Sequence, residues 1–266
     1  MHELLNHTAI QAGVLPFIAA LIIAELFQRL RLSGLAIIAG FAVTVYLASD
    51  FDFEPLTANR KIIWLGISAS AIAIPLTLLT WSYWRPILAL LAAGTAVWVT
   101  WHLLQKQSIA DELIWGAGCA AYVGWMIFWF DGLQNKPVAA GSAGLALGIG
   151  TGMAALICAS AVLGKFGLAL GSASAAYLII QAVTNSRLSC GYSFTLPLSL
   201  IAGLVGCLAF VSTRQPWYSL LALGLVPLVA NIPISEKWAV WLQTLVLSIV
   251  TFACAGGAVY LAWQHP

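Results

Sequence analysis

The sequence predicts an all-α, polytopic integral membrane protein built as a bundle of about ten transmembrane helices, and three observations predict it. Of the 266 residues, 62% are hydrophobic and only 8% are Lys, Arg, Asp or Glu, whereas a soluble domain is about 45–50% apolar and about 25% charged. The mean hydropathy is +0.96. The apolar residues form continuous runs close to the roughly 20 residues that an α-helix needs to cross a bilayer. We therefore expect most of the chain to face lipid.

The same observations exclude two other classes. A transmembrane β-barrel requires strands that alternate apolar and polar residues, and the continuous apolar runs do not alternate. A nucleic-acid partner requires clustered basic residues, but the 11 Lys and Arg residues are scattered and the net charge is +2. The expected partner is thus the lipid bilayer, with no nucleic acid.

The first eleven residues contain no Lys or Arg, so we expect no cleaved signal peptide and a retained first helix.

Charges, prolines and polar clusters divide the chain into ten apolar segments. Each should be helical, because backbone groups in hydrocarbon must be satisfied within the segment. The connections are short, so residues 1–266 form one transmembrane domain without a soluble domain. Lys165 is the single charge between Val138 and Val183, and we expect a tight turn at Gly164-Lys165. The segments are 10–28, 33–49, 61–80, 85–104, 110–130, 138–163, 166–184, 193–212, 216–233 and 238–263.

A shift of about 130 residues maps the first five segments roughly onto the last five, giving possible repeat halves 1–133 and 134–266. The fourth segment of each half begins similarly, with Arg85-Pro86 and with Arg214-Gln215-Pro216. Five helices per half would place the halves in inverted orientation, as in secondary transporters that bind substrate between their repeats. Alternatively, Arg and Pro are simply ordinary residues at a helix start. The layout is similar to the ten-helix drug/metabolite transporters in helix number and compactness only, without a family motif.

Segment 138–163 contains a stripe of small residues, Gly144, Gly148 and Gly152, with Gly150 nearby. Glycine at every fourth position lets two helix backbones approach closely, which predicts a helix–helix contact. That contact could also join two copies of the chain or a partner in a membrane complex. Alternatively, the glycines form a flexible or broken helix that lines a pathway, because glycine disfavours a helix by about 1 kcal/mol. On that reading Gly148, Gly150 and Gly152 are candidate substrate-binding residues.

Three further residues are candidates for substrate binding. Pro227 lies inside segment 216–233 and removes one helical hydrogen bond, which frees a carbonyl. That carbonyl and the amide of Asn231 could bind a polar solute, or the helix could simply end near Asn231. Gln181 is a polar residue near the end of segment 166–184, where the alternative is an interfacial amide.

Ionisable residues inside a membrane usually mark function, but none is predicted at the bilayer midplane. Glu25 and Arg29 have the spacing of a helical ion pair. Ser108 and Asp111 resemble a capping box at the start of a helix. Asp131, close to Lys136, is most simply a solvated loop charge.

The sequence offers little support for catalysis or for cofactor binding. We therefore expect neither an enzyme nor a bound cofactor or metal. The four histidines are isolated, and the HExxH and GxSxG patterns are absent. The five cysteines show no CxxC spacing, which indicates free thiols used as small hydrophobic residues.

Two functions remain. The first is a transporter or permease for a small neutral or apolar solute, with its site between the two five-helix halves. The second is a non-catalytic structural or assembly subunit of a larger membrane complex. For both we expect a multi-pass protein of a cell membrane, with a bacterial inner membrane as the default, and with both termini outside.

Overall fold

The computed structural model describes residues 9–27, 32–49, 54–78, 84–184, 190–213, 215–234 and 238–264. Within these ranges the chain contains ten α-helices and no strand. The predicted all-α class is therefore confirmed. Eight helices are long and apolar enough to cross a membrane, and two apolar helices are shorter, at Ser33–Ala48 and Trp217–Ala230. The protein is a multi-pass membrane protein by these criteria.

The ten helices correspond one for one to the ten predicted segments. A π-helical turn, Ile10–Val14, precedes the first helix, and a 3₁₀ turn, Ser33–Leu35, precedes the second. The helices are α2 (Leu15–Phe27), α3 (Ala36–Ser49), α4 (Ala58–Leu78), α5 (Trp84–Leu104), α6 (Ile109–Asp131), α7 (Pro137–Cys158), α8 (Ala161–Thr184), α9 (Gly191–Thr213), α10 (Trp217–Ala230) and α11 (Val240–Gln264).

The turn predicted at Gly164-Lys165 is wrong: α7 ends at Cys158, and α8 begins at Ala161. The Ser160 hydroxyl accepts a hydrogen bond from the Leu163 N–H at 3.2 Å, which caps the start of α8. Lys165 therefore lies in the first turns of α8, where its ammonium group donates to Gln11 Oε1 at 2.7 Å. A charge was mistaken for a helix boundary because its partner lies far away in the sequence.

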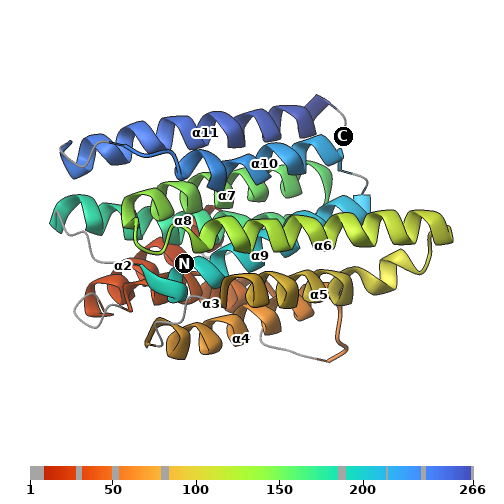
Figure 1. Cartoon of the computed structure of the whole chain (residues 1–266). Helices are drawn as coiled ribbons and strands as arrows, with labels where there is room; N and C mark the ends of the chain where they lie inside the picture. The colour runs from red at the N-terminus through yellow and green to blue at the C-terminus, as the bar shows by residue number, and fades with distance from the viewer. Residues whose placement is uncertain are drawn as a thin grey trace.

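The helices run roughly antiparallel in one bundle, with α11 and α4 at opposite edges (Figure 1). The most buried helix is α9, in which 94% of the apolar window lies inside the protein. It contacts α3, α4, α5, α6, α7 and α8. Because α6 ends where α5, α7, α9 and α11 begin, these termini gather at one end of the bundle, which we call the Asp131 end.

The outside of the bundle is apolar, as a lipid-facing surface must be. Large hydrophobic side chains are exposed on many helices, among them Leu90 at 74%, Val183 at 78% and Trp263 at 72%. Monomeric soluble proteins rarely expose contiguous apolar patches beyond a few hundred Å². The lipid bilayer as the partner of this exposed face stays a prediction.

The glycine stripe brings α7 and α8 into backbone contact. A Cβ atom added to Gly152 would lie 2.6 Å from the Leu168 N atom, and one added to Gly148 would collide with the Gly171 backbone. Helix α7 is unbroken through these residues. In this structure the stripe forms a helix–helix contact within the chain, and its part in a contact with a second copy or a complex partner stays a prediction.

The two proposed halves differ in how their first helices pack. Helix α7 contacts α8, α9, α10 and α11, whereas α2 packs mainly on α3 and α8. Pro86 lies in the first turn of α5, and Pro216 is the N-cap of α10, so both prolines stand where a helix start favours them. The repeat halves 1–133 and 134–266 stay a prediction.

We expect Gly148→Ala to lower the free energy of unfolding by about 1–3 kcal/mol, because the added methyl group forces α7 and α8 apart. The measurement is unfolding in mixed micelles, followed by circular dichroism. Gly94→Ala is the matched control, because nothing lies within 4 Å of a Cβ atom at Gly94, and it should leave stability unchanged or slightly raised. Equal effects of the two substitutions would contradict the backbone contact.

Candidate functional site

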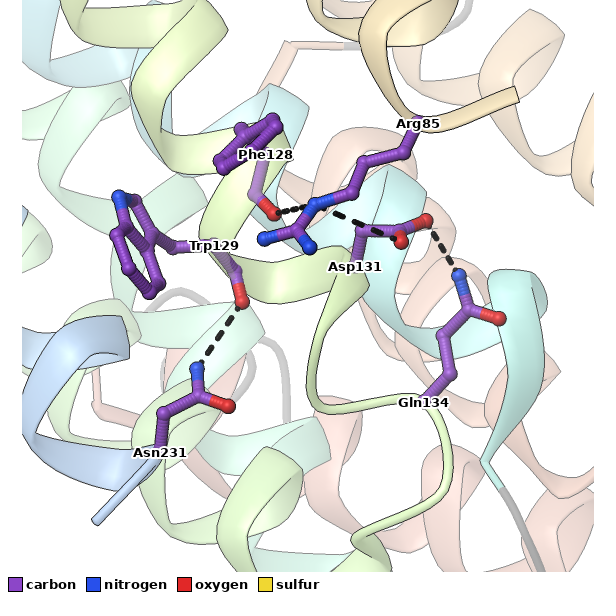
Figure 2. Close-up of polar contacts among 6 residues, drawn as sticks. All are labelled: Arg85, Phe128, Trp129, Asp131, Gln134 and Asn231. Carbon is purple, nitrogen blue, oxygen red and sulfur yellow. Dashed lines mark hydrogen bonds and ion pairs between the residues drawn. The ribbon is translucent and has the colours of Figure 1, made fainter. Parts of the chain in front are cut away.

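The strongest concentration of polar side chains inside the bundle lies at the Asp131 end. Arg85 is the second residue of α5, Asp131 is the last residue of α6, Gln134 lies in the turn before α7, and Tyr192 is the second residue of α9. We call these four residues the Asp131 cluster. Figure 2 shows Arg85 and Gln134 converging on Asp131 from opposite sides.

The Arg85 guanidinium is held by several contacts with α6. Its Nε–H donates to the Phe128 carbonyl at 2.8 Å, and its Cζ atom lies 3.6 Å from the centre of the Phe128 ring. The Nε atom also lies 3.9 Å from Asp131 Oδ2. Arg85 therefore combines a hydrogen bond to a carbonyl, a cation–π contact and an ion pair.

Asp131 was expected to be a solvated loop charge, and the structure corrects this. Its side chain is 17% exposed and pairs with Arg85. Its Oδ1 atom accepts a hydrogen bond from Gln134 Nε2 at 2.6 Å, and Asp131 and Tyr192 line the same small cavity. A carboxylate at the end of a membrane helix needs such partners, since an unpaired charge there is costly.

The start of α9 is fastened to the turn that carries Gln134. The N–H groups of Cys190 and Gly191 donate to the Gln134 carbonyl at 3.0 and 3.4 Å, and the Cys190 thiol donates to the same oxygen at 3.2 Å. Gly191 has a φ of +62°, a conformation that glycine adopts without strain. A Cβ atom there would lie 2.8 Å from Thr77 Cγ2. These contacts place Tyr192 beside Asp131.

A small cavity of about 10 Å³ adjoins the cluster, lined by residues of α5, α6 and α9 that include Asp131, Tyr192, Thr195 and Ser199. It is about the size that holds one water molecule. Thr195 and Ser199 are buried, at 2% and 0% exposed. The Thr195 and Ser199 hydroxyls donate to the Gly191 and Thr195 carbonyls of their own helix, so their oxygens can only accept a hydrogen bond from water or a solute. The Asp131 carboxylate also accepts, the Tyr192 phenol can donate or accept, and the Arg85 guanidinium balances the carboxylate charge.

Sequence reasoning missed this cluster. Arg85 was read as a helix-start residue, and segment 193–212 was treated as uniformly apolar. The available signal was the run of hydroxyl residues Ser193, Thr195 and Ser199 in one predicted span, because such residues in a membrane helix face other helices rather than lipid.

The six residues predicted to bind substrate lie in separate places. Gly148 and Gly152 face α8, whereas a Cβ atom at Gly150 would lie 2.9 Å from both Ala255 Cβ and Leu223 Cδ2, on α11 and α10. Gln181 is fully buried in α8 at 0% exposed. The structure therefore does not gather these residues around one site.

Pro227 and Asn231 lie together at the end of α10. Helix α10 ends at Ala230 with Asn231 as its C-cap. The Asn231 amide nitrogen donates to the Pro227 carbonyl at 2.9 Å and to the Trp129 carbonyl at 3.2 Å, and Figure 2 shows the second contact. Asn231 thus ties α10 to α6, and its part in solute binding stays a prediction, as do those of the other five residues.

The described residues bear on several other sequence predictions. Ser108 caps α6, since its hydroxyl accepts from the Asp111 N–H at 3.3 Å, so the capping box is confirmed in this respect. The five cysteines are free thiols, three of them buried. Glu25 is described, but Arg29, its predicted partner, lies outside the described residues. Within the described ranges no group of three His, Cys, Asp or Glu residues could hold a metal ion.

Comparison with known proteins does not place the chain in a family. No protein-family model matches the chain, and no curated protein matches it. The function must therefore be argued from the geometry above.

We expect Arg85→Gln to lower the free energy of unfolding by about 1–2 kcal/mol, because it removes the charge-assisted hydrogen bond to Phe128 and the cation–π contact. Arg60→Gln is the control, since the Arg60 guanidinium donates to the Pro55 carbonyl in an exposed position and should contribute within about 0.5 kcal/mol. Thermal unfolding in detergent measures both. A fully stable Arg85→Gln protein would contradict the assigned contacts.

We expect Cys190 to resist alkylation in the folded protein, because burial raises the pKa of its thiol to about 12 and the thiolate is the reactive form. At pH 8 the thiolate fraction is then about one in ten thousand, and it rises tenfold per pH unit until the pKa is reached. Peptide mass spectrometry after N-ethylmaleimide treatment measures the modification. Labelling of Cys190 in native protein as fast as in unfolded protein would contradict this environment.

Proposed function

We propose that this multi-pass membrane protein is a transporter or permease for a small neutral solute, with its site at the Asp131 cluster. One observation supports the proposal: the cluster and its cavity lie where α5 and α6 meet α9, and these helices fall in different halves if the predicted division into 1–133 and 134–266 holds. Secondary transporters bind substrate between their halves. Ionisable residues within membrane segments commonly mark a solute or proton path.

The proposed mechanism requires the cavity to open. At about 10 Å³ it has room for one water molecule rather than for a solute, so under this proposal the structure would represent a closed state. Helix α5 supplies Arg85, α6 supplies Asp131, and α9 supplies Tyr192, Thr195 and Ser199. Separation of α9 from α5 and α6 would expose the carboxylate and the hydroxyls together. Arg85 would keep the charge of the Asp131 carboxylate compensated while a neutral solute binds.

We propose a bacterial inner membrane as the location of the protein, which fits its short loops and free thiols.

A second candidate, a non-catalytic assembly subunit, is favoured by a different observation. The α7–α8 glycine contact and the almost complete burial of α9 describe a tightly packed core, which a static scaffold needs. In that case the Arg85–Asp131 pair only ties α5 to α6. The two functions differ in whether the cavity opens.

Thiol accessibility separates the two functions without knowledge of the substrate. We expect a cysteine at position 199 (Ser199→Cys) to react with a small water-soluble methanethiosulfonate at least about tenfold faster than one at position 174 (Ser174→Cys). Both serines are 0% exposed, but only Ser199 lines the cavity. The experiment uses protein in liposomes and resolves each site by mass spectrometry.

Equal, negligible reactivity of both positions would reject the transporter. Native mass spectrometry of protein extracted gently from its own membrane provides the second readout. A stoichiometric protein partner would favour the assembly subunit, whereas a monomer or homodimer with a small-molecule adduct would favour the transporter.

A further inference from the structure

A second and larger cavity, of about 220 Å³, lies at the Asp131 end. It is lined by the start of α7, by the end of α10 with residues 232–234, and by the first turns of α11. Most of its lining is apolar, including Pro137, Val138, Ala230, Ile234 and Leu247. Its polar lining residues are Asn135, Lys136 and Gln243. We call it the Lys136 cavity.

The Lys136 ammonium group lacks an acidic partner within the described ranges. It donates to the Asn231 carbonyl at 3.3 Å and to Asn231 Oδ1 at 3.4 Å, and both oxygens belong to neutral groups. The nearest described carboxylate along the chain, Asp131, is paired with Arg85 and Gln134. Among the described residues, the Lys136 ammonium group at the rim of the apolar cavity thus has only neutral oxygens as partners.

The start of α7 adds to this positive potential. Lys136 is the N-cap residue, no side chain caps the helix, and the first turn contains no acidic residue. Val138 and Ala139, which line the cavity, belong to that first turn. The amide groups of a helix's first turn and the helix dipole attract anions. The dipole of the 22-residue helix α7 and the charge of Lys136 both make the electrostatic potential in the cavity more positive.

Two exposed tryptophans lie close to the cavity along the chain. Trp238 and Trp241, 43% and 61% exposed, flank the start of α11, whose residues Gln243 and Leu247 line the cavity. Because tryptophan favours the boundary between headgroups and hydrocarbon, this placement indicates a cavity near that boundary. A ligand here can place an anionic group beside Lys136 and an apolar chain along Ala230, Ile234 and Leu247.

We propose that the Lys136 cavity binds the phosphate group of an anionic phospholipid, with the adjoining part of its acyl chain in the apolar lining. A phosphate oxygen would supply an anionic partner for the Lys136 ammonium group and for the amide groups in the first turn of α7. The apolar lining disfavours a free hydrated anion and favours an amphiphile. This site lies apart from the Asp131 cavity and does not depend on a transport function.

The test titrates delipidated protein in neutral detergent with phosphatidylglycerol or with phosphatidylcholine of the same acyl chains, and counts bound lipids by native mass spectrometry. We expect the wild type to bind the first phosphatidylglycerol about tenfold more tightly than phosphatidylcholine. Lys136→Gln should abolish this preference, since one charge-assisted hydrogen bond corresponds to about a tenfold change or more. Lys136→Arg should retain it.

Two controls keep the result specific. Lys106→Gln removes an exposed lysine at the opposite end of the bundle and should leave the preference unchanged. Val138→Phe fills the cavity while keeping the charge, and should reduce binding of both lipids, with folding verified by thermal unfolding. An unchanged phosphatidylglycerol preference in Lys136→Gln, or undiminished binding of both lipids by folded Val138→Phe, would overturn the proposal.

Inorganic phosphate distinguishes the two sources of a phosphate group. We expect phosphate alone to leave the thermal stability of the wild type unchanged and not to displace phosphatidylglycerol. Stabilisation by phosphate that disappears in Lys136→Gln would overturn the lipid assignment and identify a free anion as the ligand.

Discussion

The backbone contact between α7 and α8 is the interaction on which the rest of the bundle depends. Gly148 and Gly152 meet Gly171 and Gly167 without intervening side chains, and lipid offers no hydrophobic driving force that could replace such packing. Helix α7 also packs against α10 and α11, while α8 packs against α2 and α3. The pair thus joins the first and last helices of the chain into one body and leaves α9 enclosed beside it.

Polar chemistry is concentrated at one end of this body. The Asp131 cluster connects α5, α6 and α9, while Asn231 and Lys136 connect α10 with the α6–α7 turn. Both networks converge on the same stretch of chain, the end of α6 and the turn that follows it. A change in the position of α6 would therefore affect the Asp131 cavity and the Lys136 cavity together. This arrangement links a candidate solute site to a candidate lipid site through ordinary packing.

The sequence predicted the helices well because burial in lipid imposes the same requirement on each of them: an apolar run that satisfies its own backbone. It failed at Lys165, whose partner Gln11 is 154 residues away. It failed at Asp131 for the same reason, since Arg85 and Tyr192 approach from helices that are distant in the chain. The candidate binding residues were chosen because each is uncommon within its own apolar segment. Such a choice does not show which residues share a cavity. The residues concerned are Gly148, Gly150, Gly152, Gln181, Pro227 and Asn231.

What the sequence by itself determined is the class of protein, the number of helices and the small-residue stripe, because composition and periodicity act locally along each segment. Only the tertiary structure decided which charges are paired, which polar groups face a cavity and which face of each helix meets lipid. Those properties depend on neighbours that no local pattern specifies. Ser199 and Ser174 illustrate the difference: both are buried serines in apolar helices, yet only Ser199 borders the cavity beside Asp131.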